Sequence, residues 1–317
     1  MKKITDFFLI FLPLLILAQH DTKIVFYKHN LQLYNPAATG LENQTVLSST
    51  LRSQWSGIQG APDVQVFNLS IPEGEKRLGY GTSLMLDQTF IERKTSVFAS
   101  FSYRLPLGDR YSLYLGIQGG GNHINLNFND LNLADEDDGA LENLTRFYPN
   151  IGIGTYFKTD QLYISLSSPM LFAHKKDKNA DAISPTPDDD LHFYFSTGLH
   201  FPLFASDWKL ITSSLIRWIP NAPSSLIINT GFAYLKSELL FVYHRNNGFG
   251  SSAFFDNGGP ISVGYAFQFS GPSSLSQIHS GNHELILRIR FNNKKINSKA
   301  LDKHRESEDD LSMYYYP

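Results

Sequence analysis

The stretch from residue 95 to residue 104, TSVFASFSYR, alternates between two kinds of side chain. One face carries Thr95, Val97, Ala99, Phe101 and Tyr103, and the other carries Ser96, Phe98, Ser100, Ser102 and Arg104. A period of two is that of a β-strand, because successive side chains of a strand point to opposite faces. About ten residues is also the length that a tilted strand needs to cross a bilayer.

The same alternation recurs along the chain, in residues 112–118, 191–201, 261–270 and 284–291. A soluble β-sandwich would alternate as well, but its outer face would be charged. Here the polar face consists mostly of Gly, Ser, Gln and Tyr with scattered charge, which suits the lumen of a barrel. After residue 18 no run of about 18 apolar residues occurs, so a transmembrane helix is not expected. The pattern predicts an all-β, transmembrane antiparallel barrel.

The lengths of the connections give the topology and the strand count. Short connections occur at Pro106–Arg110, Lys158–Gln161, Pro202–Asp207 and Lys236–Ser237, and long ones at His123–Arg146, Met170–Asp190 and Gly271–Asn282. Outer-membrane barrels have short periplasmic turns and long outer loops, so each short turn should follow an even-numbered strand. Thirteen strands are evident, and Gly248–Asp256, followed by Asn257-Gly258-Gly259, supplies another. We therefore expect about fourteen strands.

Composition agrees with a turn-rich barrel and excludes some other classes. The 317 residues contain 14% aromatic and 18% charged residues, 23 glycines and no cysteine, with a net charge of −3. Disulfide and thiol chemistry are therefore excluded, and the charge does not indicate a nucleic-acid partner. Residues 1–18 have the basic start, apolar centre and small terminal residue of a cleaved signal peptide. A single membrane anchor is the alternative, although the apolar run is short for one.

The stretch of residues 33–62, LYNPAATGLENQTVLSSTLRSQWSGIQGAP, contains a turn, the first candidate strand and a loop. Asn35-Pro36 is a turn initiator in which proline fixes φ, and Gly40 is able to take a positive φ at the end of the turn. A strand is expected over residues 44–55, followed by a break at Gly57, Gly60 and Pro62. Ordinary turn chemistry is one interpretation of these residues.

The identity and spacing of the residues in this stretch support a more specific interpretation. The motif residues are Asn35, Pro36, Ala37, Gly40, Arg52, Gln54, Trp55, Gly57, Gly60, Ala61 and Pro62. In this order and spacing they resemble the opening of the PorP/SprF family, and the resemblance continues to Phe291. Ala38 departs from the Tyr or Phe-like residue that the family usually has. The resemblance implies an outer-membrane component associated with type IX secretion, gliding motility and the export of surface adhesins.

The chain accordingly divides into four parts. Residues 1–18 form the signal peptide, residues 19–40 a periplasmic N-terminal segment with the turn, and residues 41–291 the barrel. Residues 292–317 form a polar tail, which the even strand count places in the periplasm. The tail ends in Tyr314, Tyr315 and Tyr316, which are residues suited to docking onto a partner. A solvated tail without a partner is the alternative.

Candidate metal and catalytic motifs are weak. His283-Glu284 begins like the zinc motif H-E-x-x-H, but Leu287 stands in place of the second histidine, and neighbours on a strand point to opposite faces. The acidic loop with Asp130, Asp135, Asp137 and Asp138 lacks the EF-hand pattern, so a looser Ca²⁺ site and a solvated loop both remain open, with the solvated loop preferred. The motifs of serine hydrolases, P-loops and dinucleotide sites do not occur.

The lumen charges have two interpretations. Arg52, Arg104, Lys209, Arg217, Glu238, Glu284, Arg288 and Arg290 are expected on inner faces or near strand ends. They either pair with one another to fill the lumen or form a selectivity ladder for a small solute.

We interpret the chain as an outer-membrane barrel without catalytic activity or cofactor. It contacts membrane lipid, and the resemblance implies contacts with periplasmic and outer-membrane type IX secretion components and with a secreted surface adhesin. A diffusion channel for a small solute is the alternative function. A barrel phospholipase is a third class, but the sequence does not single out a Ser, a His and an orienting partner for it.

Overall fold

The structure is a computed structural model that describes residues 24–58, 60–72, 74, 77–127, 143–172, 191–203, 207–220, 224–245, 248–269 and 281–291. Three short helical elements come first: η1 (Tyr27–Asn30), α2 (Leu31–Tyr34) and η2 (Pro36–Ala38). The strands are β1 (Thr45–Ser53), β2 (Asp63–Ile71), β3 (Leu78–Thr89), β4 (Glu92–Pro106), β5 (Ser112–Leu126), β6 (Leu144–Lys158), β7 (Leu162–Ser168), β8 (Phe193–Pro202), β9 (Trp208–Trp218), β10 (Ser225–Tyr234), β11 (Ser237–His244), β12 (Gly248–Phe255), β13 (Ile261–Phe269) and β14 (Asn282–Phe291). No helix within the described ranges is long and apolar enough to cross a membrane.

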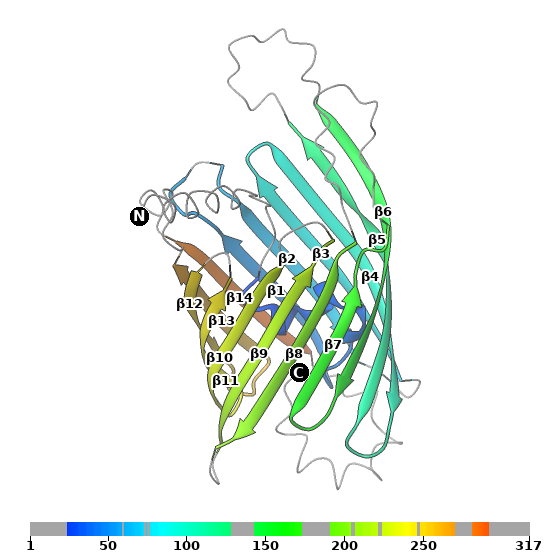
Figure 1. The fold of residues 1–317 in the computed structure, drawn as a ribbon, viewed down its shortest axis with the longest axis vertical. Helices are drawn as coiled ribbons and strands as arrows, with labels where there is room; N and C mark the ends of the chain where they lie inside the picture. Colours follow the sequence, from blue (N-terminus) through cyan, green and yellow to red (C-terminus); the bar gives the residue numbers. More distant parts are fainter. Residues whose placement is uncertain are drawn as a thin grey trace, which may run out of the picture.

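The fourteen strands form one closed antiparallel barrel, in which each strand pairs with its neighbours in the sequence (Figure 1). The barrel closes where β1 pairs with β14, from Thr45 opposite Phe291 to Ser53 opposite His283. Closure gives the backbone groups of the wall partners within the sheet, as a hydrocarbon environment requires. The predicted fold class and strand number are confirmed. Gly248–Asp256, the least evident of the predicted strands, forms β12.

The two faces of the wall follow the alternation in the sequence. In β4 the side chains of Ser96 and Ser100 are buried on the inner side, whereas Val97 and Phe101 are 53% and 46% exposed on the outer side. In β14 the buried Glu284 precedes an exposed leucine. Because the outer face is apolar along most strands, it is the face suited to lipid.

Exposed aromatic side chains lie near both ends of the strands. Near the ends that the short turns join are Tyr103, Tyr111, Phe201, Trp208, Tyr234, Phe255 and Phe291; near the other ends are Phe90, Phe147, Trp218, Phe249 and Phe269. The rings of Trp208 and Tyr234, for example, have their centroids 5.1 Å apart. Aromatic girdles of this kind lie at the two membrane–water interfaces of outer-membrane barrels.

The turns alternate between the two ends of the barrel as the connection lengths predict. The four short connections named above join β4 to β5, β6 to β7, β8 to β9 and β10 to β11, so each follows an even-numbered strand. We call the end of the barrel where they lie the short-turn end. The long connections follow β5, β7 and β13 at the opposite end. The start of β1 and the end of β14 both lie at the short-turn end, because these residues pair with each other.

Candidate functional site

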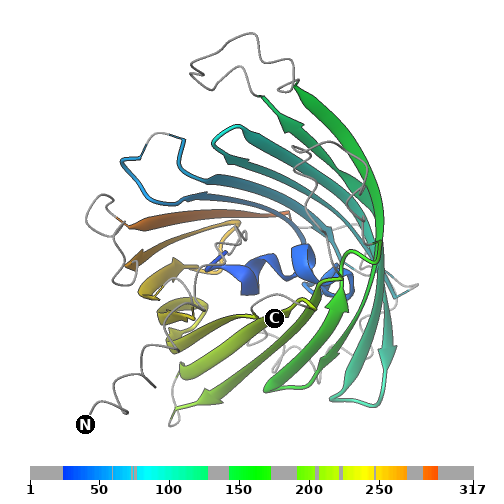
Figure 2. The same ribbon diagram turned by 45° about the horizontal axis from the view of Figure 1, so that its top comes forward.

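A segment of the chain before the first strand lies across the lumen of the barrel (Figure 2). We call residues 24–42 the plug. Ile24, Tyr27, Ala37 and Thr39 within it are completely buried. The sequence predicts a periplasmic segment over residues 19–40, whereas the structure places the described part, 24–40, inside the barrel wall. The reason lies in the side chains, which are largely apolar or amide groups and find matching partners on the wall.

Asn35 fixes the turn that the sequence indicates and joins it to the wall. Its Oδ1 accepts a hydrogen bond from the backbone N–H of Ala37 (2.8 Å), which caps η2, and Pro36 occupies the first helical position. Its Nδ2 donates to the carbonyl oxygen of Thr155 on β6 (2.8 Å) and to Oγ of Ser165 on β7 (2.7 Å). All the hydrogen-bonding atoms of a buried amide are thereby engaged.

Two glycines on the inner wall allow the turn to approach closely. Gly116 of β5 and Gly154 of β6 are directly opposite each other in the sheet. A Cβ atom on Gly116 would lie 2.1 Å from the backbone nitrogen of Ala37, and one on Gly154 would lie 1.9 Å from Oδ1 of Asn35. Both distances are far below van der Waals contact, so the turn fits here because neither wall residue has a side chain.

Other hydrogen bonds tie the plug to strands on every side of the lumen. Tyr27 Oη donates to Ser213 Oγ (2.8 Å), Asn30 Nδ2 to Thr50 Oγ1 (3.0 Å), Gln32 Nε2 to the carbonyl oxygen of Thr82 (3.1 Å), Ser102 Oγ to the carbonyl oxygen of Thr39 (2.6 Å), Ser167 Oγ to that of Tyr34 (2.8 Å), and Asn229 Nδ2 to that of Val25 (2.9 Å). The wall partners come from β9, β1, β3, β4, β7 and β10. The plug therefore acts as a central brace for the barrel.

A buried ion pair holds the beginning of the plug. Arg52 on β1 donates from Nη1 to Oε2 of Glu284 on β14 (3.0 Å) and from Nη2 to Oε1 of Gln268 on β13 (2.8 Å). The two carboxylate oxygens of Glu284 also accept the backbone N–H groups of Val25 and Phe26, at 2.7 and 2.8 Å. Arg52 thus positions the carboxylate that binds the plug backbone.

Further charge pairs lie in the lumen. Glu42, at the end of the plug, pairs with Arg288 on β14, and Lys28 pairs with Glu238 on β11 (2.6 Å). Arg290 pairs with Asp256 near the short-turn end. For these residues and for Arg52 with Glu284, the structure favours the pairing interpretation of the lumen charges over a ladder of groups along a water-filled path.

The remaining motif residues lie away from the plug, in the loop between β1 and β2. Gln54 donates its backbone N–H to the carbonyl of Pro62 (2.9 Å), and Trp55 donates its own to Oδ1 of Asn282 (3.1 Å). Gly60 accepts from the backbone N–H of Phe90 in the neighbouring turn (3.0 Å), and Ala61 donates to Ile58 (3.3 Å). Gly57 and Gly60 in this loop have φ angles of 102° and 75°, and Gly40, at the end of the turn within the plug, has a φ of 73°. The hydrogen bonds of this loop order the mouth of the barrel that is opposite the short-turn end.

Several predicted features fall outside the described residues. They are the signal peptide, the acidic loop with Asp130, Asp135, Asp137 and Asp138, and the tail with Tyr314, Tyr315 and Tyr316. His283, by contrast, is described, and its Nδ1 lies 2.7 Å from Oη of Tyr265, while the adjacent Glu284 points into the lumen. Within the described ranges, no group of three or more His, Cys, Asp or Glu side chains is placed to hold a metal ion.

Sequence reasoning missed the wall residues that receive the plug. They include Gly116, Gly154, Thr155 and Ser165, which lie on the inner faces of β5, β6 and β7 or contribute backbone atoms there. The available signal was the small size of the polar-face residues in these strands. In a lumen filled only by wall side chains, larger residues would be expected at those positions.

Comparison with known proteins identifies the family. A sequence profile described as "Type IX secretion system membrane protein PorP/SprF" matches residues 16–289. The chain belongs to the PorP/SprF family. The matched range contains the plug and the barrel wall up to Ile289, within β14, so the plug lies inside the part of the chain that matches the family.

No curated protein sequence matches this PorP/SprF chain. In structure it is similar to the outer membrane protein Omp33 of Acinetobacter baumannii, with a TM-score of 0.46, 7% identity, and coverage of 80% of this chain and 100% of that one. It is also similar to a Pseudomonas aeruginosa FadL homologue (TM-score 0.42, 10% identity, 81% and 91% coverage). A third similar structure is outer membrane phospholipase A of Escherichia coli (TM-score 0.36, 9% identity, 82% and 96% coverage).

Proposed function

We propose that this PorP/SprF barrel is a non-catalytic docking component of type IX secretion in the outer membrane. In this role it binds periplasmic and outer-membrane secretion components, or delivers and anchors a secreted surface adhesin used in gliding motility. The observation that carries the proposal is the plug, which is hydrogen-bonded and ion-paired to the wall around the lumen. A barrel with a braced interior presents fixed surfaces at its two mouths.

The plug also favours docking over the diffusion channel. A solute that crossed the lumen would have to displace buried groups such as Glu284 and Asn35 from their partners. Leaving one buried polar group without its partner costs about 1–3 kcal/mol, and several would be exposed at once. The channel function therefore requires the plug to leave, whereas docking does not.

Within this proposal, residues 292–317 carry part of the docking. β14 ends at Phe291, at the short-turn end of the barrel. The polar segment that follows ends in three tyrosines, and tyrosine is enriched among the residues that dominate binding energy at interfaces. The proposal places these residues beside the periplasmic mouth of the barrel.

Affinity capture from solubilised outer membranes tests the function. The intact chain should retain type IX secretion components or a secreted adhesin, and the chain deleted after Asn293 should retain less while all fourteen strands remain. Secretion and adhesin display in cells that carry each version give the second readout. If the deleted chain supports both at the level of the intact chain, the tail has no docking role; if neither version retains such components, the docking function itself is wrong.

Two activity measurements separate the other classes. In a planar bilayer the intact barrel should show no steady open-pore current, because the plug occupies the lumen. A steady current would support the diffusion channel instead. Turnover of phospholipid by the purified protein would contradict the non-catalytic role.

A further inference from the structure

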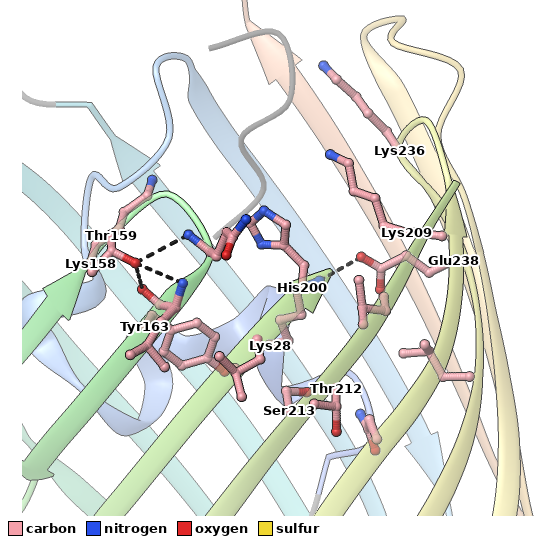
Figure 3. A pocket seen from close by; sticks show the side chains of 18 of the residues that line it. Lys28, Lys158, Thr159, Tyr163, His200, Lys209, Thr212, Ser213, Lys236 and Glu238 are labelled. Carbon is pink, nitrogen blue, oxygen red and sulfur yellow. Dashed lines mark hydrogen bonds and ion pairs between the residues drawn. The ribbon is translucent and has the colours of Figure 1, made fainter. Parts of the chain in front are cut away.

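A basic pocket opens at the short-turn end of the barrel, between the plug and the wall (Figure 3). The pocket is open to solvent, and the empty space in and before it amounts to about 790 Å³. The turns after β6 and β10 line it through Thr159 and Leu235, and the start of β9 contributes Lys209. We call it the lysine pocket.

Four lysines converge on this pocket from different elements. Lys158 ends β6, Lys209 lies at the start of β9, Lys236 lies in the turn between β10 and β11, and Lys28 belongs to the plug. Figure 3 shows Lys209 and Lys236 along one side of the pocket, with Lys158 across from them. Glu238 is the carboxylate that lines the pocket among the described residues, and Lys28 binds it at 2.6 Å.

The carboxylates of the neighbouring turns do not line the pocket. Asp160 lies 3.9 Å from Arg110 in an exposed ion pair. Asp207, which immediately precedes β9, interacts electrostatically with Lys209 and offsets part of its charge. The lining side chains therefore carry an excess of positive charge, which attracts anions into a concave site more strongly than onto a flat surface.

The rest of the lining is apolar or carries hydroxyl groups. Leu199, Ile211 and Leu240 form apolar wall, and Thr212 and Ser213 contribute hydroxyls. Lys28 is the plug residue that lines the pocket among the described residues. A ligand here would place its carboxylates at the lysines and its hydrocarbon against the leucines and isoleucine.

We propose that the lysine pocket binds a short acidic peptide segment of a partner protein. Lysine ammonium groups are compact charges that pair well with separate carboxylates, and the apolar wall accommodates the methylene stems of acidic side chains. Lipid headgroups lie outside the wall, whereas the pocket-lining residues face the lumen. The inference deepens the docking function proposed above, since it assigns the chemistry of the partner, and it rests on that function for the identity of the partner as a secretion component.

Fluorescence anisotropy with labelled hexaglutamate tests the pocket on the purified full-length barrel. Hexaglutamate should bind more tightly than hexaglutamine at the same ionic strength. The double variant Lys209→Gln/Lys236→Gln should weaken hexaglutamate binding about tenfold, because it removes two partly desolvated charge contacts. The matched control is Arg77→Asn/Arg110→Gln, which removes two exposed positive charges at the same end but outside the pocket and should change binding less than about twofold.

Three results would overturn the proposal. The first is equal binding of hexaglutamate and hexaglutamine, and the second is equal weakening of hexaglutamate binding by the two double variants. The third is full competition by inorganic phosphate at the same concentration as the peptide, which would assign the pocket to a small anion. Heat-modifiable gel mobility verifies folding, and Lys236→Gln alone, in a turn, serves if the double variant misfolds. If hexaglutamate binds but no secretion component is captured, the acidic-peptide pocket stands and the proposed docking function is wrong. If secretion components are captured but hexaglutamate does not bind, the docking function stands and the acidic-peptide pocket is wrong.

Discussion

At the scale of single residues, the approach of the plug turn to the wall depends on the absence of side chains at Gly116 and Gly154. We predict that Gly116→Ala lowers the free energy of unfolding by about 1–3 kcal/mol, because the new methyl group overlaps the backbone of Ala37. Gly119→Ala in the same strand is the matched control, since a Cβ there meets nothing within 4 Å. Urea unfolding of the barrel in detergent measures both. Equal stability of the two variants would mean that the turn does not require this approach.

The buried pair of Arg52 and Glu284 gives a second prediction at this scale. Arg52→Met should cost about 3–5 kcal/mol, because it leaves the buried carboxylate with only backbone partners from the plug. Arg110→Met is the control, because the Arg110–Asp160 pair is 3.9 Å long with side chains 75% and 48% exposed, and its loss should cost less than about 0.5 kcal/mol.

A double change separates charge from packing at the same site. Adding Glu284→Gln to Arg52→Met removes the uncompensated charge, so part of the lost stability should return. Denaturant unfolding of the four proteins of this cycle gives the coupling between the two side chains. Strictly additive losses would show that the two groups act independently, against the contact seen between them.

At the scale of elements, the strands and the plug differ in how readily the sequence reveals them. Each strand carries its own period-two signal, so even the short β12 could be predicted, with the help of the parity of the turns. The plug consists of helical elements of only three or four residues, which are too short to show a periodicity. Its partners are also distant, since Asn35 binds Thr155, 120 positions along the chain.

The same contrast applies to the candidate site. Asn35, Pro36 and Gly40 could be selected from turn chemistry, because the conformation of a turn is local. That the turn lies in the lumen depends on wall residues such as Gly116, whose lack of a side chain matters only once the barrel has closed. A prediction made from the turn alone, without knowledge of the barrel interior, therefore placed residues 19–40 in the periplasm and outside the barrel wall.

The plug as an element can be removed as a unit. Deletion of residues 24–42 should convert a silent barrel into one that conducts ions in a planar bilayer, because these residues occupy the lumen that the wall encloses. Deletion after Asn293 is the matched truncation, since it leaves the plug in place and should remain silent. Heat-modifiable mobility must show that both deleted chains are folded. A folded barrel without residues 24–42 that still does not conduct would contradict the role of the plug as the main obstruction.

At the scale of the whole molecule, the turns assign the two mouths to the two sides of the membrane. Short turns follow the even-numbered strands, and the start of β1 and the end of β14 lie with them. In outer-membrane barrels short turns are periplasmic, so we predict that the lysine pocket and the end of β14 lie at the periplasmic mouth. The loop that contains Trp55 and Gly60 lies at the opposite end, which is then the predicted outer mouth.

This orientation is tested by labelling introduced cysteines, which the cysteine-free chain permits without background. Arg245→Cys lies just after β11 at the predicted outer mouth, and Arg110→Cys lies in the turn between β4 and β5 at the predicted periplasmic mouth; both positions are exposed. A membrane-impermeant maleimide added to intact cells should label the first variant and spare the second, and should label both after the cells are broken. All turns of a closed barrel alternate between two ends. If only the Arg110→Cys variant is labelled in intact cells, every loop therefore lies on the side of the membrane opposite to the predicted one. The lysine pocket would then face the medium, where a periplasmic partner could not reach it.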